Sequence, residues 1–187
     1  MRLSTRALQP IVFDLEAQPG PWAGSDWTFR MLLAGALWTE DTGMTYLAPD
    51  FDEDELDAWT QPFRRKGTIV VGHNADKYDL PLLTGTLLKF GLPMLGTVLL
   101  SDTCSHLPKL GSAMSKRLGD LSARLDLHNQ KGSLGPYEWE AVYERQEWAL
   151  EALRAYNEAD VLATHELWKS LSEKGWLSAP KSWRPSK

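Results

Sequence analysis

Two acidic residues follow a short apolar run near the beginning of the sequence. Ile11–Phe13 leads into Asp14 and Glu16, with Leu15 between them. The run predicts a buried strand, and residues two apart on a strand share a face. Two carboxylates about 6–7 Å apart repel each other unless a cation lies between them, and oxygen ligands suit Mg²⁺ or Mn²⁺. The alternative is that the strand ends at Phe13 and both acids are solvated loop residues, and this pair alone does not decide between the two.

A second group of polar residues lies in the stretch VVGHNADKYDLPLL. An apolar strand ends at Gly72, His73 and Asn74 follow, and Asp76 and Asp79 open a predicted helix. Ligands of open α/β sheets gather at the carboxyl ends of strands, so these side chains are candidates for a site. The alternative is that the acids only favour the positive N-terminus of the helix, which fits Asp76 better than Asp79.

A third pair lies in YNEADVLATHELW, within a long predicted helix. Tyr156 and Asp160 are four residues apart and therefore lie on one helix face. Asp160 borders the apolar side of this helix, whereas Glu158 points elsewhere. A half-buried tyrosine near an acid also occurs by chance, so this pair alone is a weak signal.

The elements that must position these residues form an α/β pattern. Strands come first, then strands alternate with helices, then helices dominate, which predicts a mixed sheet of about five strands flanked by helices. The expected strands cover 11–16, an antiparallel hairpin over 27–49, 68–72 and 94–103. The expected helices cover 50–67, 76–91, 118–127 and 137–175, the last of which could be two helices.

Composition limits the possible functions. The 187 residues include 43% hydrophobic and 24% charged residues, as in a globular protein of one domain. The net charge of −5 argues against a broad duplex-binding face but permits metal-mediated nucleotide binding. With a single cysteine, Cys104, no apolar run long enough for a membrane and no signal-peptide core, we expect a cytoplasmic protein. We expect one domain over residues 1–177 and a flexible, Pro-rich basic tail over 178–187.

Taken in order, the three motifs resemble the DEDDy group of 3′–5′ exonucleases, which are DnaQ-like enzymes with a ribonuclease H-like fold. The sequence is most similar to the proofreading domain of phage DNA polymerases of the polymerase I family. The similarity runs from about Ile11 to Leu171, and His-Asn-x-x-Lys-Tyr-Asp is its most specific part. Asp76 departs from the pattern by adding an acid, and no polymerase domains follow the similar segment.

This resemblance implies a two-metal hydrolysis of phosphodiester bonds by a stand-alone exonuclease, with two Mg²⁺ or Mn²⁺ ions. Asp14, Glu16 and Asp160 would hold the metal that binds the attacking water, and Asp14 and Asp79 the second. Tyr156 would orient the water. Leu15, His73 and Asn74 would contact the 3′-terminal nucleotide. The expected substrate is a single-stranded DNA 3′ end, as in proofreading for a separate polymerase or in end processing, in the host cytoplasm if the gene is from a phage.

Two alternatives stay open from the sequence. The first is an RNA 3′ exonuclease of the same fold, because nothing in the sequence reports recognition of a 2′-hydroxyl. The second is a catalytically silent module that binds nucleic acid or a polymerase, although such a module would be expected to lose acids that are present here. We interpret Asp102 as structural or as lining the DNA groove and His165 as a packing or surface residue. Lys109, Lys116, Arg117 and Arg124 are candidates for a modest strand-guiding surface.

Overall fold

The computed structural model describes residues 8–18, 31–108 and 115–185. Its strands are β1 Gln9–Gln18, β2 Met31–Thr39, β3 Gly43–Leu47, β4 Thr68–Gly72, β5 Val98–Asp102 and β6 Lys181–Trp183. Its helices are α1 Glu53–Thr60, α2 Asp79–Lys89, α3 Leu118–Arg124, α4 Pro136–Tyr143 and α5 Glu147–Glu173, and a 3₁₀ turn covers Gln61–Arg64. The expected mixed α/β architecture is confirmed, with two helices in the last segment.

The six strands form one mixed sheet in the order β3-β2-β1-β4-β5-β6. β1, β4 and β5 are parallel neighbours, whereas β2, β3 and β6 pair antiparallel. The antiparallel β2–β3 hairpin confirms its prediction from Met31 on, whereas residues 27–30 of the expected range lie outside the described residues. The sixth strand was not expected: Lys181–Trp183 pairs with Val98–Leu100, so this part of the tail belongs to the sheet.

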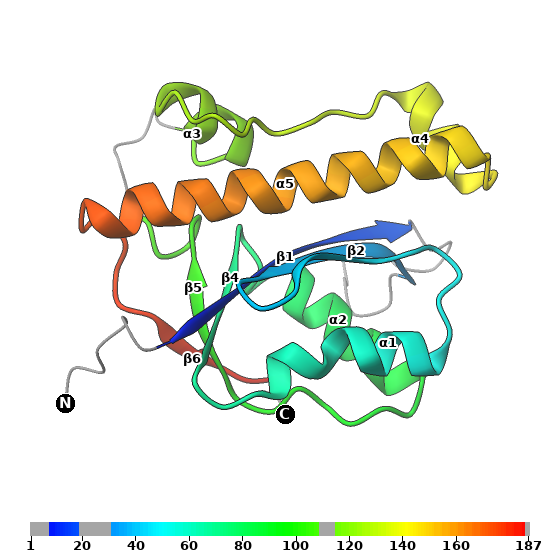
Figure 1. Ribbon diagram of the computed structural model, residues 1–187, viewed down its shortest axis with the longest axis horizontal. Coiled ribbons are helices and arrows are strands. Elements are labelled where there is room, and N and C mark those ends of the chain that lie inside the picture. The colour runs from blue at the N-terminus through cyan, green and yellow to red at the C-terminus, as the bar shows by residue number, and fades with distance from the viewer. Residues whose placement is uncertain (1–7, 19–30, 109–114, 186–187) are drawn as a thin grey trace.

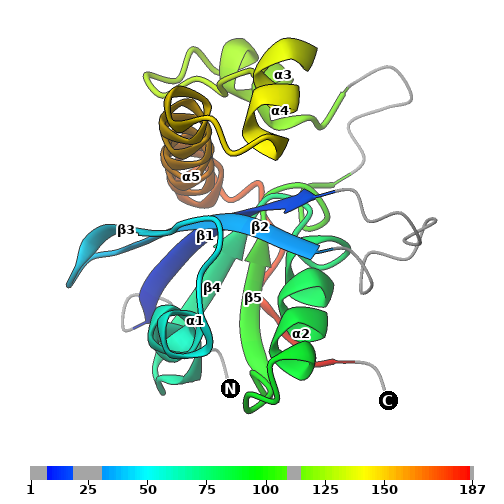
Figure 2. The same cartoon turned by 90° about the vertical axis from the view of Figure 1, so that its right-hand side faces the viewer.

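Helices cover both faces of the sheet (Figures 1 and 2). α1 and α2 lie on one face, α5 crosses the other, and α3 and α4 pack on the far side of α5. The period of two along β1 explains the division. Phe13 and Leu15 point into the core formed with α1 and α2, whereas Val12 packs on the α5 side with Val161. Asp14 and Glu16 therefore point toward α5.

The first helix ends earlier than its sequence suggests. Asp52 caps it through a capping box with Glu55. The α-helix stops at Thr60, and Gln61–Arg64 tightens into the 3₁₀ turn that contains Pro62. The basic run 64–66 is therefore not the end of an α-helix, and Arg64 instead pairs with Asp57 at 2.7 Å.

Candidate active site

Three carboxylates from β1 and α5 meet on the face of the sheet that α5 covers. Asp14, Glu16 and Asp160 each offer an oxygen, and these oxygens lie within 4.8 Å of one another. The residues opposite Asp14 and Glu16 on β2 are Ala36 and Ala34. Because cross-strand partners share a face, these small side chains leave room for the acids beneath α5. The acidic pair is thus part of the strand, and the loop alternative for Asp14 and Glu16 is wrong.

Asp79 approaches the same place from the first residue of α2. It is 8% exposed, and its Oδ1 accepts a hydrogen bond from the backbone N–H of Leu15 at 3.1 Å. This bond ties the beginning of α2 to the centre of the Asp14–Glu16 pair. Leu15 contributes its backbone here, because its side chain is 8% exposed and belongs to the core.

The acidic cluster carries more negative charge than its surroundings offset. Burial, followed by the charges of Glu16, Asp79 and Asp160, raises the pKa of Asp14 well above its ordinary value. Burial and then Asp160 raise the pKa of Glu16 to about 8, and burial raises that of Asp79 to about 7 despite the Leu15 hydrogen bond. Burial also raises the pKa of Asp160, although Lys131 opposes this shift.

Lys131 lies against this cluster and was not found from the sequence. Its Nζ donates to Asp160 Oδ2 and, at 2.9 Å, to the hydroxyl of Tyr156. Burial lowers the pKa of Lys131, but the hydrogen bond and charge of Asp160 outweigh this effect and raise it. A single lysine in a loop has no periodic pattern that would mark it as a site residue. The only hint in the sequence was that Lys131 lies shortly before the last two helices.

Tyr156 lies one turn before Asp160 on α5, as the spacing predicted. Burial and the charges of Glu16 and Asp160 raise the pKa of its hydroxyl to about 12, so the phenol stays protonated at neutral pH. Gly132 lies against its ring: a Cβ on this glycine would be 3.1 Å from Tyr156 Cδ2. Tyr156 is therefore a neutral hydrogen-bonding group beside the acids and not a base.

Asn157 is a second residue that the sequence analysis missed. It is fully buried, and its Nδ2 donates to Asp14 Oδ2 at 2.7 Å. The signal was available, since a polar side chain next to Tyr156 in the middle of a helix needs a buried partner. Asn157 fixes the orientation of Asp14 without adding charge.

His73 and Asn74 lie at the end of β4, next to the acids. Gly72 permits the turn that places them, because a Cβ there would be 2.4 Å from the Cβ of Ala75. Asn74 has a positive φ of 67°, and its N–H donates to Asp102 Oδ1 at 3.0 Å. His73 Nδ1 bonds with Thr103 Oγ1 at 2.8 Å, and burial lowers the pKa of the imidazole.

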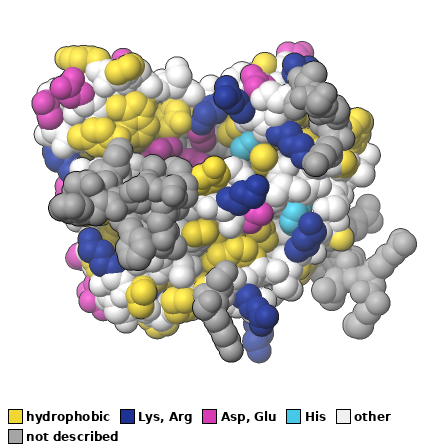
Figure 3. Space-filling view, turned by 180° about the vertical axis from the view of Figure 1, so that it is seen from behind, with side chains coloured by type: hydrophobic (Ala, Val, Ile, Leu, Met, Phe, Trp, Pro, Cys, Tyr) yellow, Lys and Arg dark blue, Asp and Glu magenta, His cyan; other side chains and the backbone are white. Residues whose placement is uncertain are grey.

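Two cavities open on either side of Asp14, which lines both. The larger, about 550 Å³, holds His73 and Asn74 and carries the cationic side chains of Lys116, Arg117 and Lys131. The smaller, about 380 Å³, is lined by Glu16, Asp79 and mostly by apolar or aromatic side chains, namely Leu15, Ala17, Tyr78, Leu82, Trp139 and Tyr143. On one face of the molecule, acidic side chains lie in a hollow between hydrophobic side chains and a group of Lys and Arg (Figure 3).

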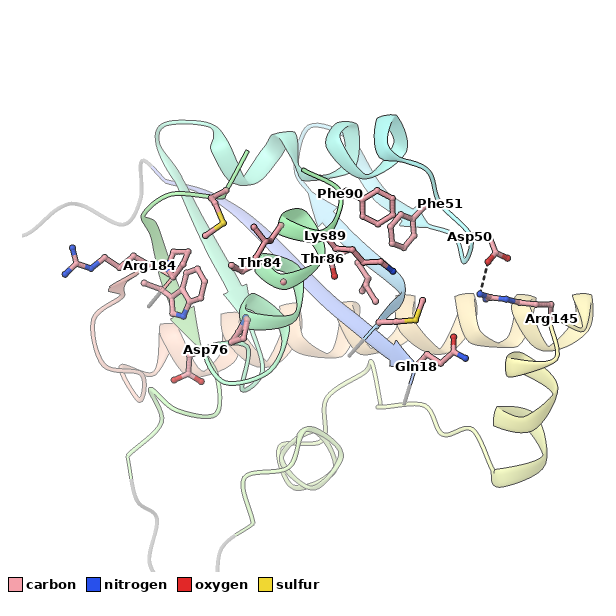
Figure 4. A pocket seen from close by; sticks show the side chains of 18 residues that line it. Gln18, Asp50, Phe51, Asp76, Thr84, Thr86, Lys89, Phe90, Arg145 and Arg184 are labelled. Atoms are coloured by element: carbon pink, nitrogen blue, oxygen red, sulfur yellow. Dashed lines mark hydrogen bonds and ion pairs between the residues drawn. The ribbon is translucent and has the colours of Figure 1, made fainter. Parts of the chain in front are cut away.

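A still larger cavity, about 930 Å³, lies away from the acids on the outer side of α2 (Figure 4). Phe51, Phe90 and Trp183 line it, and the ion pair of Asp50 with Arg145 lies at its border. It contains none of the four clustered acids. Because convergent polar groups mark a candidate site better than size does, the cavities beside Asp14 are better candidates than this larger one.

The donor set suits a divalent cation. Carboxylate oxygens are the preferred ligands of Mg²⁺ and Mn²⁺, and the buried Oδ1 of Asp160 has no hydrogen-bond partner among the residues that the structure describes. Lys131 offers one positive charge to four clustered acids, so the remaining charge is neutralised either by protons, as the raised pKa values indicate, or by bound cations. The residues present therefore fit a metal site.

Comparison with known proteins supports the fold. No family model matches the sequence, and no curated protein matches it. Among solved structures, the family B DNA polymerase from the hyperthermophilic archaeon Pyrobaculum calidifontis matches with a TM-score of 0.70 and 16% identity over 88% of this chain. The fold is ribonuclease H-like. The matched region is 24% of the polymerase chain, so this chain spans about a quarter of its neighbour. Within the described residues, no helix has the length and apolar composition needed to cross a membrane.

Proposed function

We propose that this chain is a metal-dependent 3′–5′ exonuclease that removes nucleotides from DNA ends. The observation that carries the proposal is the acidic cluster itself, in which the oxygens of Asp14, Glu16 and Asp160 lie within 4.8 Å beside a tyrosine. The order of the motifs supports the exonuclease class, and the structural likeness to a DNA polymerase supports a nucleic acid as substrate.

Asp14, Glu16, Asp79 and Asp160 would hold two divalent cations, Mg²⁺ or Mn²⁺. When bound, such ions lower the pKa of water and stabilise the attacking and leaving oxygens of phosphodiester hydrolysis. Leu15 and Asn157 keep two of these acids in place by hydrogen bonds to Asp79 and Asp14.

Tyr156 and Lys131 act on the substrate side of the cluster. With a pKa of about 12, the hydroxyl of Tyr156 donates or accepts a hydrogen bond without losing its proton, which suits orientation of a water molecule. Lys131 holds this hydroxyl and Asp160 together, and its ammonium offsets part of the charge that an incoming phosphate would meet.

The two cavities would bind different parts of the substrate, the terminal base and the phosphate backbone. The smaller cavity offers Trp139 and Tyr143, whose rings suit stacking on an unpaired terminal base, and the larger one offers cations that suit the phosphate backbone. His73 lines both and would lie between base and backbone. Leu15 also lines the smaller cavity, although most of its side chain is buried in the core. Only the exposed part of this side chain would contact the base.

The test uses 5′-labelled single-stranded, mismatched and blunt DNA, with matched RNA, in Mg²⁺ or EDTA. The proposal expects a ladder of shortened DNA products that EDTA abolishes. Faster degradation of the RNA set would transfer the assignment to an RNA 3′ exonuclease. Retention of intact substrate under all metal conditions, despite nucleic-acid binding, would favour the catalytically silent module.

A further inference from the structure

One carboxylate outside the acidic cluster holds the loop that carries Lys131. Glu166 lies on α5, six residues after Asp160. Its Oε1 accepts the backbone N–H of His128 at 2.9 Å, and its Oε2 accepts the backbone N–H of Asn129 at 2.8 Å and the side-chain Nδ2 of Asn129 at 2.9 Å. Backbone hydrogen bonds to Asn129 and His128 lower the pKa of Glu166, so the carboxylate is ionised at neutral pH. Three N–H groups therefore converge on one charged side chain.

The held segment belongs to an irregular stretch between α3 and α4. Neither His128 nor Asn129 lies in a helix or strand, so their N–H groups have no ladder to join. A carboxylate makes stronger hydrogen bonds than a neutral acceptor. The carboxylate of Glu166 thus accepts the backbone hydrogen bonds that a helix or strand partner would otherwise accept.

Lys131 follows only two residues later and returns to the same helix. Its Nζ contacts Asp160 and Tyr156, so α5 holds the segment at two levels about 9 Å apart along its axis. A lysine side chain has four methylene groups joined by rotatable bonds, so holding its ammonium in one position costs rotamer entropy. That cost is smallest where the backbone from which the stem starts is itself fixed.

We propose that Glu166 is a positioning residue that acts through the backbone of His128 and Asn129 to place the ammonium of Lys131 against Asp160 and Tyr156. The inference rests on the proposed nuclease function for its effect on catalysis. The placement of Lys131 does not depend on that function and is measurable by itself.

The first measurement is the acylation of Lys131 by acetic anhydride in EDTA, followed by peptide mass spectrometry. The variants are E166A, E166Q and, as a matched control, E151Q, because Glu151 is an exposed glutamate on the same helix. The expected labelling rate of Lys131 rises about fivefold or more in E166A and less in E166Q, which keeps one acceptor oxygen, and is unchanged in E151Q.

The second measurement is single-turnover cleavage of labelled DNA in Mg²⁺. E166A is expected to lower the rate about tenfold with little change in the substrate concentration at half-saturation. The double variant K131M/E166A should be no slower than K131M alone, because both changes remove the same interaction.

Circular dichroism in parallel shows whether each variant folds, and E166Q decides the matter if E166A does not fold. Unchanged protection of Lys131 in a folded variant, or a double variant slowed by the full product of both single effects, would overturn the inference. A wild-type protein that does not cleave nucleic acid would overturn the proposed function, while the labelling result would still decide the role of Glu166.

Discussion

Two aspartates on strands of one sheet, Asp14 in the middle of β1 and Asp102 at the end of β5, meet opposite environments. Asp102 ends β5 and is fully buried. It accepts hydrogen bonds from four backbone N–H groups at 2.7–3.3 Å, those of Asn74, Asp76, Cys104 and Ser105. The chain itself satisfies this charge, and in doing so it ties the loop after β4 to the loop after β5.

Asp14, on β1, accepts a hydrogen bond from the side chain of Asn157. Burial and then the charges of three acidic neighbours, Glu16, Asp79 and Asp160, raise its pKa. The residue type and the sheet are the same as for Asp102, but the supply of donors differs. A carboxylate surrounded by backbone N–H groups stabilises the fold by itself. One surrounded by other carboxylates is stable only when protonated or paired with a cation.

The largest expected effect is the loss of activity in Asp14→Asn. The variant keeps the shape of the side chain but removes one ligand charge from the cluster, so cleavage of single-stranded DNA in Mg²⁺ should fall about a thousandfold or more. A labelled-oligonucleotide assay measures this. If D14N kept wild-type cleavage, the acid would not belong to the reaction site.

Asp102→Asn should lower stability, whereas Asp14→Asn should not. Loss of the charge, and of acceptors for N–H groups that stay buried, is expected to lower the free energy of unfolding by about 2–4 kcal/mol. D14N in EDTA should be as stable as the wild type or more stable, because it removes repulsion. Urea unfolding of both variants in EDTA compares them, and equal destabilisation would erase the distinction.

A smaller effect follows from the raised pKa values of Glu16, about 8, and Asp79, about 7. At pH values between the pKa of these acids in the unfolded chain and their pKa in the folded protein, the folded state binds more protons than the unfolded state. The metal-free protein therefore loses stability as pH rises from about 5 to about 8. We expect a melting temperature about 5 °C lower at pH 8.5 than at pH 5.5 in EDTA. Glu16→Gln should weaken this dependence, and a profile unchanged in that variant would contradict the shift.

The smallest effect concerns Tyr156→Phe. Loss of the hydroxyl removes a hydrogen bond to Lys131 and a water-orienting group, but no ligand charge. We expect a turnover rate about tenfold lower with nearly unchanged stability. Tyr137→Phe, at a tyrosine that is 68% exposed, is the control. Equal rates for the two variants would remove Tyr156 from the site.

Local periodicity made much of the fold and three of the four acids predictable. The two-residue period of a strand predicted that Asp14 and Glu16 share a face. The spacing of four residues on a helix predicted the same for Tyr156 and Asp160. The short strand β6 was not predictable, because three residues carry no pattern and its pairing depends on β5. Asp79 was a candidate from its place at the beginning of the helix that follows a strand end, but its hydrogen bond to Leu15 joins residues 64 apart and left no local pattern.

Lys131 and Glu166 show why the rest of the site could not be predicted. Each acts across an irregular loop, and neither has a spacing that sets it apart from surface charges. Asp102 was interpreted as structural or as lining the DNA groove. Its hydrogen bonds show a structural role, but the four N–H partners come from two separate loops and depend on the tertiary fold. Contacts set by loop geometry leave no periodic signal in a single sequence.

We propose that Asp14, Glu16, Asp79 and Asp160 hold divalent cations and that Asp102 does not. Electron paramagnetic resonance of free Mn²⁺ during titration counts bound ions directly in wild type, D14N and folded D102N. The account predicts two bound ions in the wild type and in D102N and a loss of binding in D14N. No Mn²⁺ binding by the wild type, or equal binding by wild type and D14N, would contradict it.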